Sequence, residues 1–128
     1  VIVVQDPTLL PVMDVFAGLR PQGFALVNST KSLEELGLGH LVAAHPAGHV
    51  ITIPAFDIAR EHVGRPVPNA VMLGGVAALT GLIRLQSVVD AIHHRFPGRV
   101  GDGNAAAATA AYELVTSEKA KKGTSVHA

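Results

Sequence analysis

Three short apolar segments, alternating with segments that carry helix signals, constrain this fold most. They occupy residues 1–5, 24–28 and 49–53, and continuous runs of this kind are typical of strands buried on both faces of a parallel sheet. Strand–helix–strand units almost always connect parallel strands by right-handed crossovers. We therefore expect an α/β fold, a layered α/β/α sandwich with a mainly parallel sheet. Since the first strand starts at residue 1, we also expect sheet neighbours upstream of this sequence.

Local signals predict a helix after each of these strands. Aspartate, threonine and serine are typical N-terminal caps, and glycine or proline is typical of the residues that follow a helix. The predicted helices run from Leu9 to Leu19, from the Ser32 and Glu35 capping-box pair toward Gly39, and from Ala55 to Val63 ahead of Gly64.

The last third of the sequence predicts helices only. Asn69 is a candidate cap for a helix that reaches Thr80 and is apolar around its whole circumference, which indicates burial on all sides. Gly74 and Gly75 within it suggest close packing of the backbone against a neighbour. Further helices are expected over residues 85–96 and 104–115. We thus predict a single α/β domain over residues 1–116, with a flexible polar tail over residues 117–128.

Composition restricts the possible functions. Ten basic and ten acidic side chains cancel, so the chain has no general positive field for nucleic acid. Without cysteine it has no thiolate nucleophile and no cysteine-ligated iron–sulfur or zinc site. Charged residues make up only 16% of the chain, which suggests that much of its surface faces other protein. No apolar run reaches the ~20 residues of a membrane helix, so we expect no membrane span.

Two motifs suggest cofactor sites but lack the required context. His45 and His49 have the spacing of two metal ligands on one helical face, yet Pro46 makes the intervening stretch a turn. Surface or interface histidines are the preferred interpretation over a metal site. Residues 101–106 match the dinucleotide fingerprint G-x-G-x-x-A, but no strand fits between them and Pro97. A flexible glycine loop capped by Asn104 is the preferred interpretation.

Polar side chains near the ends of the first two strands are the best candidates for a binding site. Asp6, Pro7 and Thr8 follow the first strand, and Asn28, Ser29 and Thr30 follow the second. Open α/β sheets bind ligands in crevices at the carboxyl ends of their strands, although such residues also serve as ordinary caps and turns. The segment 57–61, with its Asp, Arg and Glu, is interpreted as a solvated helix face. No catalytic residue is assigned.

An ordered series of motifs over about residues 1–114 resembles a known family. The motifs are Val3–Leu10, Gly18–Gly23, Val27–Thr30, Ile53–Ala55, Ile58–Ala59, Gly64–Asn69, Leu73–Gly74, Leu79–Leu82, Ala91–Ile92, Phe96–Gly98 and Asn104. In this order they resemble the gamma subunit, or gamma domain, of 2-oxoacid:acceptor oxidoreductases such as pyruvate:ferredoxin oxidoreductase. The family's glycine-rich N-terminal strand–loop–helix is absent, so the match corresponds to the C-terminal two-thirds of a gamma-type domain.

The resemblance implies a subunit that supports oxidative decarboxylation of a 2-oxo acid to acyl-coenzyme A while carrying no cofactor itself. Thiamine diphosphate, iron–sulfur clusters and coenzyme A would belong to a cytoplasmic complex with alpha, beta and delta-type (ferredoxin-like) subunits, and electrons would pass to ferredoxin or another acceptor. The 2-oxo acid stays open among pyruvate, 2-oxoglutarate, branched and aromatic acids.

We further expect two sets of residues to face partner subunits. The residues at the strand ends, Asp6 to Thr8 and Asn28 to Thr30, would lie near the acyl-transfer region, and Arg65, Pro66 and Asn69 would belong to a rigid interface loop. Two other functions stay open. One is a stand-alone α/β module that binds a small molecule without catalysis. The other is a nucleotide-dependent oxidoreductase that uses residues 101–106.

Overall fold

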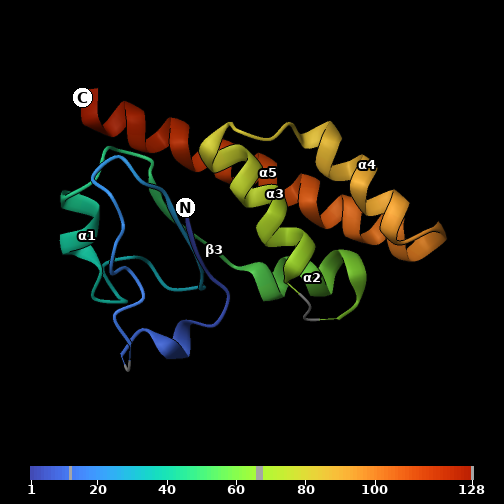
Figure 1. Cartoon of the computed structure of the whole chain (residues 1–128), viewed down its shortest axis with the longest axis horizontal. Coiled ribbons are helices and arrows are strands. Elements are labelled where there is room, and N and C mark those ends of the chain that lie inside the picture. The colour runs from blue at the N-terminus through green and yellow to red at the C-terminus, as the bar shows by residue number, and fades with distance from the viewer. Residues whose placement is uncertain (12, 66–67, 128) are drawn as a thin grey trace.

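The computed structural model describes residues 1–11, 13–65 and 68–127 (Figure 1). Strands β1 (Ile2–Val4), β2 (Ala25–Asn28) and β3 (Val50–Ile53) form one parallel sheet in the order β1-β2-β3. All three carboxyl ends therefore meet at one edge of the sheet. The predicted parallel sheet is confirmed.

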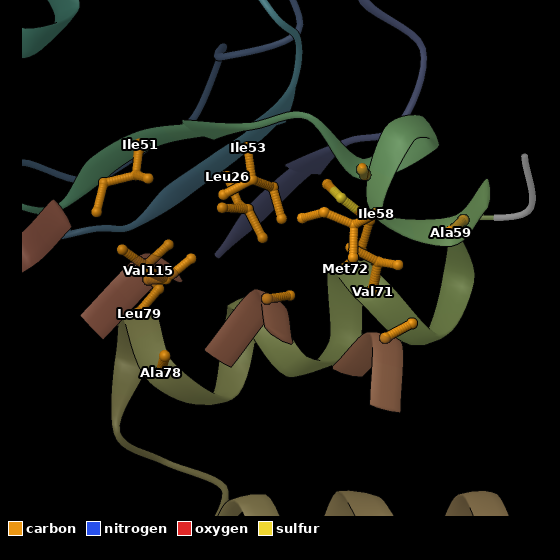
Figure 2. Close-up of a cluster of buried hydrophobic side chains, with 13 residues drawn as sticks. Leu26, Ile51, Ile53, Ile58, Ala59, Val71, Met72, Ala78, Leu79 and Val115 are labelled. Carbon is orange, nitrogen blue, oxygen red and sulfur yellow. The ribbon is translucent and has the colours of Figure 1, made fainter. Parts of the chain in front are cut away.

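Longer helices cover one face of this sheet. They are α2 (Ala55–Val63), α3 (Asn69–Thr80) and α5 (Gly98–His127), with α4 (Leu85–Arg95) packed outside on α3 and α5. Figure 2 shows Leu26, Ile51 and Ile53 pointing from the strands toward Leu79 and Val115 of the helices. These strand residues are fully buried because apolar helix faces cover them.

The opposite face of the sheet carries a thinner layer. Val4, Ala25, Val27 and Val50 point into it and pack against the short helix α1 (Gly39–Ala43) and against irregular chain. The fold is thus layered as predicted, with helices on both faces and a helical C-terminal part. The second outer layer is mostly loop, as the left part of Figure 1 shows.

The helix predicted over residues 9–19 does not form in the described part of that segment. Only a 3₁₀ turn, η1 (Pro7–Leu9), is present, followed by turns that include Gly18 at a φ of 84°. The apolar residues of the segment still pack on the sheet, since Leu10, Val15, Phe16 and Leu19 are partly buried against it. Apolar residues with helical spacing are thus buried here by an irregular loop instead of a helix.

The capping box forms without the predicted helix. Ser32 N–H donates to Glu35 Oε1 and Glu35 N–H donates to Ser32 Oγ, both at 3.1 Å. The residues that follow are turns, because Gly37 takes a left-handed φ of 77°, and helix α1 begins only at Gly39.

The longest helix contradicts the loop predicted at residues 101–106. Helix α5 starts at Gly98 and contains the whole G-x-G-x-x-A motif. Asn104 is not a cap, since its Nδ2 donates to Val100 O at 2.9 Å inside the helix. A Cβ on Gly103 would lie 2.7 Å from His62 O, and one on Gly101 would overlap Phe96 O. These glycines permit close backbone packing, and the strand–loop–helix that a dinucleotide site requires is not there.

Helix α5 also continues through the segment predicted as a flexible tail. It remains helical to His127, and Lys119 Nζ donates to Ala78 O at 3.1 Å and to Leu79 O at 3.0 Å. These carbonyls lie in the last turn of α3, where a helix leaves acceptors unused. Lys119 thereby anchors the end of α5 to α3.

The glycine pair of α3 packs as predicted. A Cβ on Gly74 would overlap the backbone of Ala108 in α5, and one on Gly75 would lie 2.7 Å from Leu26 Cδ2. Asn69 is not the cap of α3: Pro68 takes that position, and no side chain caps the helix. No helix in the described ranges is long and apolar enough to span a lipid bilayer.

Candidate functional site

A cleft of about 400 Å³ lies at the carboxyl ends of the strands. We name it the strand-end cleft, and its lining combines residues that follow β1, β2 and β3. They are Pro7, Thr8, Asn28, Ser29, Thr30, Lys31, Leu36, Pro54, Phe56, Asp57 and Arg60. Parallel strands bring both predicted strand-end segments to one place, with Asp6 just outside the lining.

Asn28 holds together the chain segments that form this cleft. It is 2% exposed, its Nδ2 donates to Gln5 O at 2.9 Å, and its Oδ1 accepts from Ala55 N–H at 2.9 Å. One side chain thus joins the ends of β1 and β2 to the start of α2. Because both ends of the amide are used inside the protein, we assign Asn28 a positioning role.

Asp6 and Thr8 form a closed local turn. Asp6 Oδ1 accepts from Thr8 Oγ1 at 2.6 Å and from Thr8 N–H at 3.0 Å. The hydrogen bond from the Thr8 hydroxyl, and next the one from its backbone N–H, hold the pKa of Asp6 below its ordinary value. Asp6 is therefore a charged acceptor that sets the position of Thr8.

Ser29 is engaged in the loop after β2, whereas Thr30 is open. Ser29 Oγ accepts from Lys31 N–H at 3.0 Å, and Ser29 N–H donates to Ile53 O at 2.9 Å. Thr30 is exposed, and within the described ranges its hydroxyl makes no hydrogen bond to the protein. The Thr30 hydroxyl can consequently serve a ligand or a partner chain.

Sequence reasoning missed the contribution of α2 to the cleft. Phe56, Asp57 and Arg60 lie on its first turns, directly after β3, and Arg60 Nη1 pairs with Asp57 Oδ1 at 3.3 Å. Both side chains of this pair are largely exposed, which agrees with the predicted solvated face. The sequence did contain one signal for this contribution, an aromatic residue, Phe56, directly before Asp57 on the predicted helix. In the structure Phe56 is 39% exposed.

The lining of this site offers hydroxyls, the ammonium of Lys31, an ion pair and an aromatic ring, groups that can bind and orient a ligand or a partner chain. Within residues 1–11, 13–65 and 68–127, no three His, Cys, Asp or Glu side chains lie close enough to hold a metal ion.

The two histidines considered as metal ligands, His45 and His49, make contacts inside the protein. His45 Nδ1 lies 2.8 Å from Leu41 O, and its Nε2 lies 3.2 Å from Arg20 O. The His49 ring stacks on Phe24 with centroids 4.2 Å apart. Both side chains therefore hold loops in place, which the sequence interpretation of surface or interface histidines did not anticipate.

The predicted interface loop lies apart from the strand-end cleft. Arg65 lines a different hollow, at the end of α2, and Asn69 is exposed at the first turn of α3. Pro66 lies outside the described residues.

Comparison with known proteins gives a consistent set of relatives. A family model described as pyruvate ferredoxin/flavodoxin oxidoreductase matches residues 1–114. The chain is 42% identical over 112 residues to pyruvate synthase subunit PorC of Methanothermobacter marburgensis, a match over 88% of this chain and 58% of that protein. It is 44% identical over 112 residues to the pyruvate/ketoisovalerate oxidoreductases common subunit gamma of Thermococcus kodakarensis, over 88% and 59% of the two chains.

A solved structure agrees with these sequence matches. The crystal structure of pyruvate oxidoreductase subunit PORC from Thermotoga maritima superposes with a TM-score of 0.70 at 33% identity, and covers 87% of this chain and 60% of that one. The chain thus spans about three fifths of the length of its relatives. Since the family model matches 114 of the 128 residues, the chain belongs to the pyruvate ferredoxin/flavodoxin oxidoreductase family.

Proposed function

We propose that this chain acts as the gamma subunit of a 2-oxoacid:acceptor oxidoreductase. In this role it supports oxidative decarboxylation of a 2-oxo acid to acyl-coenzyme A, with electrons passed to ferredoxin or another acceptor. The observation that carries the proposal is the family match over residues 1–114, together with relatives named as pyruvate synthase and pyruvate/ketoisovalerate oxidoreductase subunits.

Cofactor chemistry is assigned to other chains of a cytoplasmic complex. Alpha, beta and delta-type subunits would hold thiamine diphosphate and the iron–sulfur clusters. The supporting observation is that this chain has no cysteine, the usual ligand of such clusters. Its own residues would bind and orient, because the strand-end cleft has donors and acceptors without an acid–base pair.

The strand-end cleft is proposed as the face toward the partner subunits and the acyl-transfer region. The cleft is lined by Thr8, Thr30, Lys31 and Phe56. The two hydrogen bonds of Asn28 fix the strand ends beside them, so the binding groups are in position before a partner binds. Asn69 is exposed next to a proline-rich segment, and we propose that it contributes a second contact.

A stand-alone module that binds a small molecule is the second candidate. The observation that favours it is the volume of the cleft, about 400 Å³, which lies within the range of roughly 300–1,000 Å³ typical of small-molecule sites.

Native mass analysis separates the two candidates. The tagged chain, purified anaerobically from its own cells, should co-purify with chains that carry thiamine diphosphate and iron–sulfur clusters. The variants Thr30→Val and Phe56→Ala should weaken this association while the purified chains stay folded by circular dichroism. The exposed Gln86→Ala change on α4, distant in sequence from the cleft, is the control. A monomer or simple homodimer that binds a small molecule with full affinity would favour the stand-alone module.

A further inference from the structure

A further hollow, whose lining is separate from that of the strand-end cleft, lies where the end of α2 meets the start of α5. It measures about 450 Å³ and is lined by His62, Val63, Arg65, Arg99, Val100 and Gly103. We name it the α2–α5 hollow. Its lining shares no residue with the strand-end cleft.

The lining of the α2–α5 hollow carries positive charge without a matching acid. Arg65 follows α2 and Arg99 lies in α5, and no carboxylate is among the described residues that line the hollow. Within the described ranges neither guanidinium forms an ion pair or a hydrogen bond to the protein. The nearest acids in the sequence are directed elsewhere or exposed: Asp102 lies 3.8 Å from His93, and Glu61 is on the surface of α2.

The geometry of the hollow is fixed by backbone packing. Gly64 ends α2 in a left-handed conformation at a φ of 86°, which turns the chain toward Arg65. Gly103 lets α5 approach His62 so closely that a Cβ would lie 2.7 Å from His62 O. The end of α2, which leads into Arg65, and the start of α5, which carries Arg99, are therefore held in close backbone contact.

We propose that the α2–α5 hollow binds a phosphate group, as inorganic phosphate or a phosphate monoester. Guanidinium groups match phosphate oxygens in bidentate geometry, and a doubly charged anion can engage two separate arginines at once. A single carboxylate would neutralise only one of them. The start of α5 also lines the hollow, and the first backbone N–H groups of a helix have no partner within the helix, which makes a minor contribution. This site goes beyond the proposed function and does not require assembly with other subunits.

The test uses the full chain and inorganic phosphate, followed by ¹H–¹⁵N NMR at constant ionic strength. Phosphate should shift the amide signals of residues 62–65 and 98–103 saturably, with a Kd on the order of a millimolar. The variants Arg65→Gln and Arg99→Gln should each weaken binding about five- to tenfold. Arg84→Gln, at the exposed start of α4, should bind like the parent chain.

Three outcomes would overturn the proposal. They are the absence of saturable shifts, equal shifts with chloride at the same ionic strength, and unchanged affinity in both arginine variants. A titration with glycerol 3-phosphate distinguishes a monoester site, which binds it at least as tightly, from a site for free phosphate. Acetate binding as tightly as phosphate would replace the proposal with a carboxylate site. Assembly of the parent chain with partner subunits is measured in a separate experiment. A failure of the phosphate site therefore leaves the proposed subunit function testable, and the reverse also holds.

Discussion

The buried amide oxygen of Asn28 accepts a 2.9 Å hydrogen bond from Ala55 N–H, which ties the end of β2 to the first residue of α2. The other end of the same amide donates to Gln5 O at the end of β1. The candidate site is therefore supported by a polar residue that is itself almost fully buried.

Asn28→Ala should destabilise the protein by about 2–4 kcal/mol, because it leaves the buried Ala55 N–H without a partner and removes a part-buried hydrogen bond to Gln5 O. Urea unfolding followed by circular dichroism measures this change. Asn69→Ala is the matched control, since Asn69 is exposed and caps nothing, and it should change stability by less than about 0.5 kcal/mol. Equal effects of the two variants would refute the positioning role of Asn28.

Gly74→Ala should destabilise the packing of α3 against α5. The added methyl group would overlap the Ala108 backbone, which cannot move as a side chain can, and overpacking of this kind costs typically 1–3 kcal/mol. Gly39→Ala is the control, because it meets no atom within 4 Å and its φ is not in the left-handed region. Thermal unfolding of both variants provides the measurement, and a Gly74→Ala protein as stable as Gly39→Ala would contradict this contact.

Lys119→Met should lower the free energy of unfolding by about 1–2 kcal/mol, since it removes two charge-assisted hydrogen bonds to the last turn of α3. Hydrogen exchange should then show faster opening of α5 after residue 115. Lys119→Arg retains the donors and should recover much of the loss. Unchanged exchange in Lys119→Met would mean that the anchor does not contribute in solution.

Thr8→Val should raise the pKa of Asp6 toward 3.8, because the Thr8 hydroxyl is the largest cause of its lowered value. The contribution of this hydrogen bond to stability is present above the unfolded pKa and is lost as the pH falls through the lower folded pKa. A carboxyl ¹³C NMR titration of the parent and of the Thr8→Val protein measures the pKa of Asp6 in each. Glu35, whose lowered pKa depends on Ser32, is the internal control and should titrate identically in both proteins.

The sequence alone determined those elements whose signals are local. Helix α2 lies between Pro54 and Gly64 as predicted, because proline starts the helix and a left-handed glycine ends it. The parallel arrangement was expected from apolar strand segments joined by crossover connections, although the edge strand β1 leaves Val3 exposed. The two strand-end segments could be expected at one edge for the same reason, and the cleft contains both.

Only the tertiary structure decided the elements whose local signals conflict with packing. Residues 101–103 have the composition of a loop but are helical. Gly103 lets α5 approach the end of α2, and Gly101 lets α5 approach the backbone of Phe96, which precedes the helix. Residues 9–19 have a helical period but form a loop on the sheet in their described part. The contribution of Phe56 and Arg60 to the cleft was likewise hidden, since it depends on where α2 starts relative to β1 and β2. Burial against distant segments outweighs local propensities of about 1 kcal/mol per residue, and the sequence does not state which segments those are.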